Sequence, residues 1–142
     1  MAGGQVLDLQ LTGSGAQIAQ LDHIHELKTG ALIRFSVVAP AIIGQCKDPT
    51  TSALDRFGSC VGLGFQIRDD ILDVTGDANQ TGKLPHADAL RNKPTYPAIV
   101  GLNASCMAAE RLRDEALGCL QSLPGDTSGL AWLADYMINR NC

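Results

Sequence analysis

The sequence is poor in aromatic residues and in charge, and neither hydrophobic residues nor charges of one sign form long runs. Aromatic residues make up 4% and charged residues 18% of the 142 positions, and the net charge is −4. Because no stretch is rich in lysine and arginine, nucleic-acid binding is not expected. No apolar run reaches membrane-spanning length, and the first residues do not combine a basic region with an apolar one as signal peptides do.

The spacing of the five cysteines fits neither a set of disulfides nor a structural metal site. They are odd in number and include no C-x-x-C pair, so neither a disulfide framework nor zinc-ligand spacing is indicated. Reduced thiols are typical of the cytoplasm, where we expect this protein. Hydrophobic residues make up 45% of the chain, enough for the core of a single domain over residues 1–142. We expect Trp132 and Tyr136 to lie in that core.

Strand signals are equally scarce, whereas apolar residues recur at helical spacing. Asp48 as a helix cap with Pro49 in the first turn is a strong helix start. Asn103 is a second candidate helix cap, and Pro40 should end or kink the helix in which it lies. We predict an all-α fold with about six helices. The expected helices are 1–11, 21–38 with a continuation over 41–44, 49–74, 96–102, 104–122 and 128–140, and the expected loops are 12–16, 75–92 and 124–127.

The most informative segment is 65–77, where Asp69, Asp70 and Asp73 interrupt a largely apolar helix. On a helix that advances about 100° per residue, these aspartates and Gln66 share a stripe roughly 100° wide. Such a stripe is usually a solvated surface, but here apolar neighbours cover most of the remaining helix, which favours burial. Buried carboxylates need a cationic side chain, a metal ion or both. Oxygen ligands without thiolate or imidazole favour Mg²⁺ or Ca²⁺ over zinc, and the spacing does not fit an EF-hand.

Three lysines are candidates for the positive charge that the buried carboxylates need. Lys28 precedes Thr29 within an apolar helix, and Lys83 and Lys93 lie in or beside the loop that follows the acidic helix. Each lysine alone would be interpreted as a solvated or snorkelling side chain. Lysines beside acid-bound metal ions, however, together make a phosphate site, because the metal ions bridge phosphate oxygens and the lysines neutralise the rest.

Other candidate residues have plainer interpretations. We interpret His23, His25 and His86 as surface or helix-end residues. The Gly-Gly-Gln segment at 3–5 fits a close contact between helices and an ordinary surface equally well. No serine or cysteine has an evident base partner, so nucleophilic catalysis has no support.

These segments, in this order, are similar to those of a known family. Gly-Phe-Gln-Ile-Arg-Asp-Asp-Ile-Leu-Asp-Val-Thr-Gly-Asp at 64–77, Thr-Gly-Lys at 81–83 and Asn-Lys-Pro-Thr-Tyr-Pro at 92–97 resemble the second aspartate-rich region of trans-prenyltransferases. Gly-Gly-Gln-Val-Leu-Asp-Leu at 3–9 and His-x-x-Lys-Thr-Gly-Ala-Leu at 25–32 resemble two further helices of these enzymes. The likeness covers essentially the whole chain and is to the C-terminal half of bacterial short-chain polyprenyl diphosphate synthases of the farnesyl diphosphate synthase (geranyltranstransferase) type.

The resemblance implies a condensation of isopentenyl diphosphate with an allylic diphosphate, dimethylallyl or geranyl, to give geranyl or farnesyl diphosphate. The allylic substrate loses pyrophosphate with the help of three Mg²⁺ ions, for which Mn²⁺ is the alternative. The double bond of isopentenyl diphosphate attacks the resulting carbocation, and a proton leaves. The implied metal ligands are Asp69, Asp70 and Asp73, which would bind directly or through water.

The resemblance also implies substrate-binding and catalytic roles for the other polar residues. Lys28 and Lys83 would contact the allylic diphosphate, with Lys93 near the same cluster. Thr29 and Gln66 would line the cavity near the reacting carbons, where carbonyl and amide dipoles steady positive charge. Catalysis would then depend on electrostatic preorganisation and metal ions.

Two segments of the family have no counterpart in the sequence. They are the first aspartate-rich motif with its pair of arginines and the Gly-Lys-Arg segment that holds isopentenyl diphosphate. We therefore expect the C-terminal half of such an enzyme, inactive alone, with the missing half as a partner and a homodimer as the usual assembly. A binding or regulatory subunit completed by a separate chain is the alternative. A half bundle would expose an apolar face, so we expect dimers or aggregates. Product length depends in this family largely on residues just before the absent motif.

Overall fold

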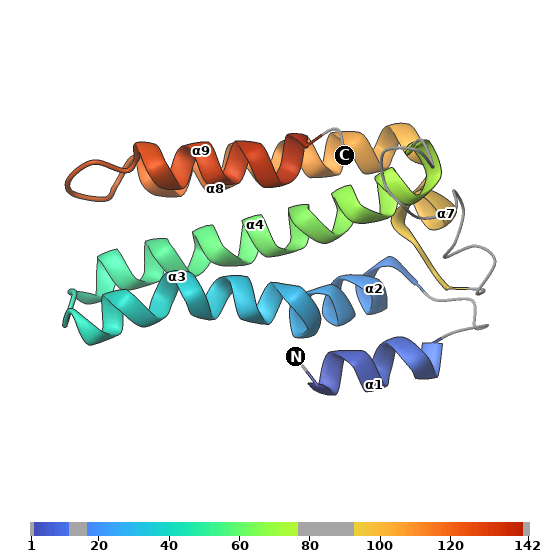
Figure 1. The fold of residues 1–142 in the computed structure, drawn as a ribbon, viewed down its shortest axis with the longest axis horizontal. Coiled ribbons are helices and arrows are strands. Elements are labelled where there is room, and N and C mark those ends of the chain that lie inside the picture. The colour runs from blue at the N-terminus through green and yellow to red at the C-terminus, as the bar shows by residue number, and fades with distance from the viewer. Residues whose placement is uncertain (1, 12–16, 77–92, 141–142) are drawn as a thin grey trace.

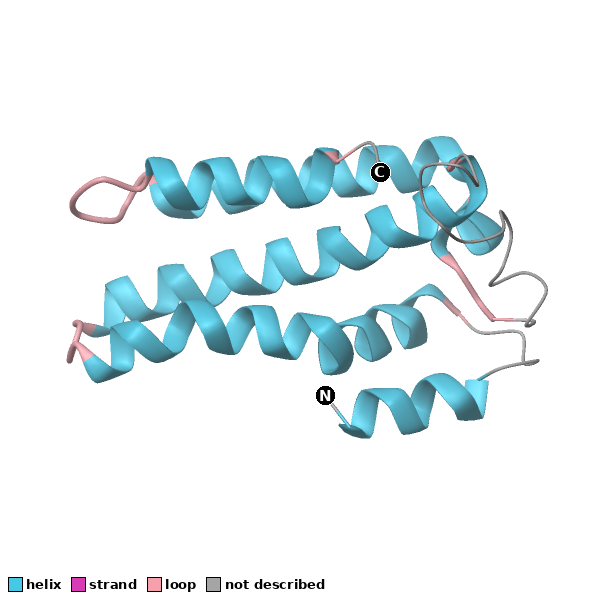
Figure 2. Cartoon of the chain, in the orientation of Figure 1, coloured by secondary structure: helices cyan, strands magenta, loops and turns pink. Residues whose placement is uncertain are grey.

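The computed structural model describes residues 2–11, 17–76 and 93–140, and every regular element among them is a helix (Figures 1 and 2). Because α2, the short π-helical segment η1 and α3 follow one another without a loop, they make one bent rod. Counted in this way, the described residues form six helical rods, and the predicted all-α fold is confirmed. The elements are α1 (Ala2–Leu11), α2 (Ile18–His25), η1 (Glu26–Gly30), α3 (Ala31–Ile43), α4 (Asp48–Thr75), α7 (Tyr96–Val100), α8 (Leu102–Leu120) and α9 (Ser128–Asn139).

The long helix α4 is the centre of the arrangement. Figure 1 shows α8 and α9 on one side of it and the bent α2–α3 rod on the other, with α1 beyond α2 and η1. The short α7 lies at one end of the bundle and contacts α8, α4 and α2. The C-terminal part of α4 therefore lies beside α2 and α7, and η1 contacts the middle of α4, where Gly30 meets Gly62.

The core lies mainly between α4 and the α8–α9 pair. Phe57 and Ile67 of α4 are completely buried, as are Ala116 of α8 and Ala134 of α9. These residues belong to one continuous cluster in which apolar residues recur at helical spacing. Burial of a large apolar side chain of this kind stabilises a fold by about 1.5–3 kcal/mol.

Glycines bring the other face of α4 into backbone contact with the bent rod. A Cβ atom added at Gly62 would lie 2.8 Å from the Cα atom of Gly30, and one at Gly58 would lie 2.9 Å from the Cα atom of Arg34. Real Cβ atoms do not approach so closely, so any side chain at these positions would push the helices apart. The glycines thus fix η1 and α3 tightly against α4.

Helix termini differ from the predictions in ways that local chemistry explains. The prediction that Asp48 caps α4 is wrong, because Lys47 occupies the cap position and Asp48 is the first helical residue. Asn103 is likewise inside α8, which follows Gly101 in the left-handed region at φ 87°. α3 continues through Pro40 to Ile43, because the carbonyl that Pro40 leaves without a donor lies on an exposed part of the helix.

Other boundaries are close to those expected. α2 begins at Ile18, earlier than predicted, because Gln17 and Gln20 form a capping box at its N-terminus. The segment 124–127, predicted as a turn, lies in the connection between α8 and α9, where the chain turns at 121–122 and bends at 123–125. The predicted loop at 12–16, and residues 77–92 of the loop predicted at 75–92, lie outside the described residues.

The expectation that Trp132 and Tyr136 lie in the core is wrong. Trp132 is 65% exposed and Tyr136 is 58% exposed, and their rings stack on each other with centroids 5.3 Å apart on the outer side of α9. Helical spacing predicts that the two rings lie close together, but it does not predict which side of the helix faces the core.

Among the helices of the described residues, none combines the length and the hydrophobicity that a membrane-spanning segment needs.

Candidate functional site

The three aspartates of α4 have different surroundings. Asp70 is only 7% exposed, and its Oδ2 atom accepts a hydrogen bond of 2.9 Å from the backbone N–H of Tyr96. The side chain of Asp69 is 51% exposed. Asp73 is half-buried, and Gln66, one turn before Asp70, is buried. The predicted burial of this stripe is therefore confirmed for Gln66 and Asp70 and is wrong for Asp69, which lies at its edge.

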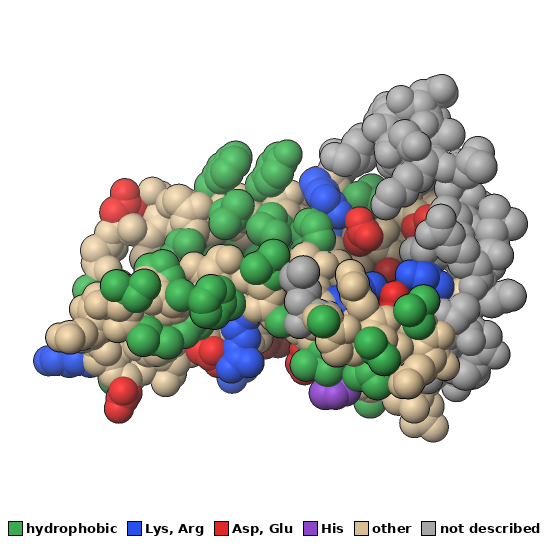
Figure 3. Space-filling model, turned by 60° about the horizontal axis from the view of Figure 1, so that its bottom comes forward, with side chains coloured by type: hydrophobic (Ala, Val, Ile, Leu, Met, Phe, Trp, Pro, Cys, Tyr) green, Lys and Arg blue, Asp and Glu red, His purple; other side chains and the backbone are tan. Residues whose placement is uncertain are grey.

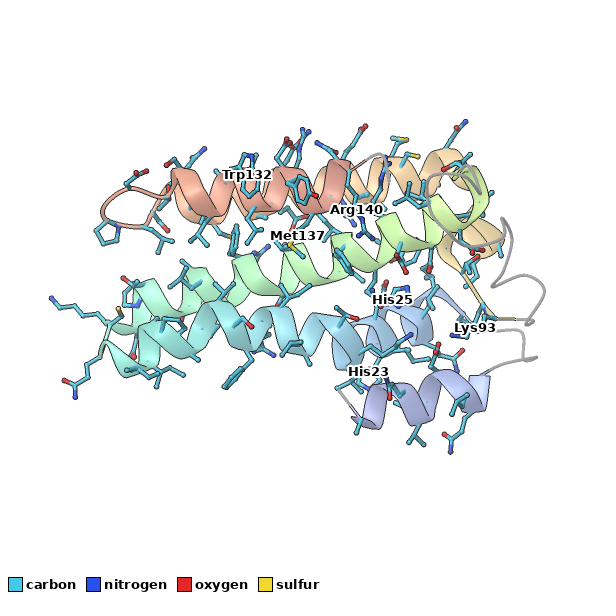
Figure 4. All side chains as sticks on the ribbon, viewed as in Figure 1. His23, His25, Lys93, Trp132, Met137 and Arg140 are labelled. Atoms are coloured by element: carbon cyan, nitrogen blue, oxygen red, sulfur yellow. The ribbon has the colours of Figure 1, made fainter. Side chains whose placement is uncertain are left out.

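Asp69 pairs with a cationic side chain, but this side chain is an arginine that the sequence analysis did not predict. Nη2 of Arg140, just after α9, donates to Oδ1 of Asp69 at 2.9 Å. The guanidinium also lies 4.3 Å above the ring of Phe65, and Arg68 donates to the Arg140 carbonyl at 2.8 Å. Figure 4 shows Arg140 where the end of α9 meets α4. The ring and the carboxylate together hold the arginine in one place.

The predicted lysines come together around an acid on α1. Nζ of Lys28 lies 3.1 Å from Oδ2 of Asp8, and Nζ of Lys93 lies 2.9 Å from the same oxygen. Within the described residues, therefore, Lys28 and Lys93 pair with Asp8 and not with the aspartates of α4. Partial burial acts to raise the pKa of Asp8, but hydrogen bonds and charge from Lys93 and Lys28 outweigh it and hold the pKa below its ordinary value. Asp8 stays ionised and gathers two cations at one point.

Lys28 lies at a break in the helix. Its backbone angles, φ −86° and ψ −120°, are not helical, and the chain is continuous helix on both sides of η1. α1 rests directly on this break, because a Cβ atom added at Gly4 would lie 2.6 Å from the carbonyl carbon of Leu27 and 2.7 Å from the nitrogen of Lys28. Of the two interpretations of the 3–5 segment, close helix contact is correct for Gly4. Short π-helical segments of this kind are frequent at functional sites.

The positions of the remaining predicted residues follow from their neighbours in the structure. The close approach of Gly30 and Gly62 puts η1, and hence half-buried Thr29, beside α4 one turn before Gln66. Lys93 lies at the same end of the bundle as α7 (Figure 4). Lys83 lies outside the described residues. The structure thus places the break at Lys28, the lysine pair and the polar end of α4 at one end of the bundle, with Asp8 and Arg140 as additions.

The prediction that the histidines are surface or helix-end residues is right for one of them and wrong for another. His23 is exposed, as expected, and His86 lies outside the described residues. His25 is not a surface residue: it is 5% exposed, and its Nε2 atom lies 3.3 Å from Oδ2 of Asp70. The sequence carries no clear signal for this burial, because it results from the packing of α4 and α7 against α2.

The aspartate carboxylates of α4 suit a magnesium ion that takes its other ligands from phosphate and water. Among the described residues, no three carboxylate, imidazole or thiolate side chains converge closely enough to form a metal site by themselves. Asp69 and Asp73, four residues apart on one helix, lie near enough to act together. Mg²⁺ is typically held by one or two carboxylates together with phosphate oxygens and water. The carboxylates therefore fit a magnesium ion that arrives with a phosphorylated ligand.

A family model described as polyprenyl synthetase matches residues 1–122 of this chain. The chain belongs to this family. It is 43% identical over 145 residues to farnesyl diphosphate synthase of Escherichia coli (strain K12), an alignment covering 99% of this chain and 48% of the relative. It is 36% identical over 144 residues to farnesyl diphosphate synthase of Geobacillus stearothermophilus, again covering 99% of this chain and 48% of the relative. The chain thus spans about half the length of these curated relatives.

Solved structures agree with this assignment. The Helicobacter pylori geranyltransferase, solved in complex with magnesium and isoprenyl diphosphate, is 32% identical and superposes with a TM-score of 0.79 over 98% of this chain and 46% of its own. The polyprenyl synthase of Caulobacter crescentus CB15 superposes with a TM-score of 0.91 over 99% of this chain and 56% of its own. At 23% identity, the second likeness establishes the fold alone.

Proposed function

We propose that this chain supplies the magnesium–pyrophosphate half of a prenyltransferase that condenses isopentenyl diphosphate with dimethylallyl or geranyl diphosphate. The observation that carries the proposal is the meeting of Lys28 and Lys93 at one oxygen of Asp8. Two ammonium groups from segments far apart in the sequence form a concentrated positive site beside a helix that carries aspartates. Membership of the polyprenyl synthetase family supports the same chemistry.

The lysines would exchange a carboxylate for phosphate. In the structure each ammonium group is held by Asp8, which is a smaller anion than a diphosphate. Lys28, Lys93 and the predicted Lys83 would turn to the oxygens of an allylic diphosphate, neutralise charge that builds up as pyrophosphate departs, and return to Asp8 afterwards. Groups already fixed near the developing charge lower the barrier without reorganisation at the moment of reaction.

Magnesium would reach the site with the substrate. Asp69 and Asp73 are the proposed ligands, and Asp70 contributes through its Oδ1 atom or through water, because Oδ2 already accepts from Tyr96 and His25. When bound, Mg²⁺, or Mn²⁺ in its place, would draw negative charge away from the leaving pyrophosphate. Three such ions are expected in the complete enzyme. Thr29 and Gln66, at the break and on the buried side of α4, would steady the allylic cation with their dipoles.

The partner of this chain would be the other half of the longer relatives. An apolar face runs along α3, where Leu32, Phe35, Ile42 and Ile43 are more than half exposed. A groove of about 480 Å³ lies between α3 and α4, with Phe35 and Val38 in its wall. Figure 3 shows hydrophobic side chains spread over the side of the molecule that carries α1 and α3. We propose that this face is covered by the remaining half of a cytoplasmic synthase, which itself forms a homodimer, and that without it the chain associates with itself.

Calorimetric titration with inorganic pyrophosphate in the presence and absence of Mg²⁺ tests the binding site. We expect magnesium-dependent binding that weakens at least tenfold in Lys28→Ala and in Lys93→Ala. Lys47→Ala is the matched control, because Lys47 is an exposed lysine between α3 and α4. Equal affinity in all four proteins would contradict the proposal.

A turnover assay tests the division of the enzyme into halves. Incubated with isopentenyl and dimethylallyl diphosphates and Mg²⁺, the chain alone should give no sustained product. Added to the part of the Escherichia coli relative that has no counterpart here, it should give geranyl or farnesyl diphosphate. Sustained turnover by the chain alone would show that the missing half is unnecessary.

A further inference from the structure

A buried polar junction, formed by His25, Asp70 and Tyr96, lies behind the candidate site. Nε2 of His25 is 3.3 Å from Oδ2 of Asp70, and the backbone N–H of Tyr96 donates to the same oxygen at 2.9 Å. Because a carboxylate only accepts, the proton between His25 and Asp70 belongs to Nε2. All three residues are less than 8% exposed. In Figure 4, His25 lies between α2 and α4.

The junction connects elements that are distant in the sequence. His25 and Asp70 are 45 residues apart, and Asp70 and Tyr96 are 26 apart. The rings of His25 and Tyr96 also stack, with centroids 6.1 Å apart and planes at 15°. The hydroxyl of Tyr96 donates to Asp22 on α2. Burial and the bond to Asp22 raise the pKa of Tyr96 above its ordinary value, so the hydroxyl remains a donor at neutral pH.

Each residue of the junction lies close in the sequence to a candidate site residue. Lys28 follows His25 by three positions, and Lys93 precedes Tyr96 by three. Asp69 is the immediate neighbour of Asp70 and Asp73 lies on the next turn. The distances among the lysines and the proposed metal ligands therefore depend on how these three polar residues contact one another, in addition to the glycine contact between η1 and α4.

We propose that His25 is a positioning residue: its hydrogen bond to Asp70 fixes the lysine side of the site, on η1, relative to the aspartate side, on α4. This inference rests on the proposed function and extends it. The hydrogen bond of His25 within the described residues is to Asp70, so it acts through Asp70 and through the backbone that leads to Lys28. The bond to Asp70 satisfies Nε2 of the ring, whereas Nδ1 is buried without a hydrogen-bond partner among the described residues. A buried hydrogen bond of this kind specifies one arrangement more sharply than apolar packing does.

Paired substitutions separate the hydrogen bond from the space that the ring fills. His25→Gln keeps an N–H donor near the position of Nε2, whereas His25→Phe keeps the ring and its stack on Tyr96 but loses the donor. His23→Phe is the control, because His23 is an exposed histidine on the same helix. We expect the affinity for inorganic pyrophosphate with Mg²⁺ to fall at least tenfold in His25→Phe, to stay within threefold in His25→Gln, and not to change in His23→Phe.

Two outcomes would overturn the proposal: undiminished affinity in His25→Phe, or an equal loss in His25→Phe and His25→Gln. Circular dichroism checks folding, and His25→Asn, whose amide is one methylene shorter, replaces the phenylalanine variant if that variant does not fold. If even the unmodified chain binds no pyrophosphate, the proposed function fails, and amide hydrogen exchange then tests the junction. Faster exchange at Tyr96 and at residues 28–30 in the phenylalanine variant than in the glutamine variant supports the positioning role, and equal rates contradict it.

Discussion

The two ends of α4 are held by different interactions. From Asp48 to Gly64 the helix is packed by apolar side chains such as Phe57 and by the glycines that touch η1 and α3. From Gln66 to Thr75 the buried side chains include an amide and a carboxylate, and the carboxylate has partners from two other elements. The first arrangement depends mainly on shape, with ion pairs such as Arg34 with Asp55 at its exposed edge, whereas the second needs buried donors and acceptors in the right places.

The two ends of α4 therefore contribute differently to the free energy of unfolding and to the geometry of the proposed site. Apolar packing contributes most to the free energy of unfolding but distinguishes weakly between similar arrangements. Buried polar contacts contribute less net stability, yet each misplaced partner costs a desolvated group, so they restrict the arrangement strongly. Substitutions at the apolar end should therefore change stability, and substitutions at the polar end should change pyrophosphate binding.

The largest effect on stability is expected at the apolar end. Phe57→Ala removes a completely buried ring and should lower the free energy of unfolding by about 3–5 kcal/mol. Urea denaturation measures this change. The affinity of the remaining folded protein for pyrophosphate should match that of the unmodified chain, because Phe57 lies nine residues before Gln66, more than two turns along α4 from the proposed site. A loss below about 1.5 kcal/mol, or a changed affinity in the folded fraction, would break the distinction between the two ends.

A smaller effect is expected for the acid that gathers the lysines. Asp8→Asn removes the charge from two partly buried ion pairs and should lower the free energy of unfolding by about 1–2 kcal/mol at neutral pH. The pKa of Asp8 is lowered in the folded state, so its contribution is complete above the ordinary value of 3.8 and is lost as pH falls through the lower folded-state pKa.

Urea denaturation at several pH values checks this sign. The unmodified chain and Asp8→Asn should differ at neutral pH and converge in acid. Asp114→Asn, an exposed aspartate beside Arg113, is the control and should alter stability little. A difference that persists unchanged into strong acid would show that the charge of Asp8 is not what matters.

The smallest effect on stability is expected on the outer face of α3. Phe35 is 67% exposed, so Phe35→Lys should change the free energy of unfolding by no more than about 0.5 kcal/mol. It should nevertheless reduce self-association measured by size-exclusion chromatography, whereas Met107→Lys, which alters a 70% exposed residue on α8, should not. A compact monomer already formed by the unmodified chain would contradict the proposal that this face needs a partner.

The sequence predicted the helices well because each depends on local periodicity. The stretch of α4, the end of α1 at Leu11 and the connection around Pro124 between α8 and α9 all follow from spacing and from turn residues. The break at Lys28 could not be predicted in this way, since no proline lies near it and the contact with Gly4 comes from another helix.

Partners in space were harder to predict than residues in a motif. Lys28, Lys83 and Lys93 were predicted from the sequence as cations for the acidic helix. In the structure, Lys28 and Lys93 share a different partner, Asp8, which lies 20 and 85 residues away from them. The Gly-Gly-Gln-Val-Leu-Asp-Leu segment contained the signal without indicating that its aspartate faces the lysines. His25 failed for the same reason, because burial is decided by what packs against a helix and not by the helix itself.

The contact of Gly4 with the helix break has a consequence for how this end of the molecule tolerates change. Gly4 lies four positions before Asp8, which is about 6 Å along α1. A single methyl group at position 4 has no room and would tilt α1 away from η1. The carboxylate would then leave both ammonium groups, and an alanine in place of a glycine would alter the local electric field without adding or removing any charge.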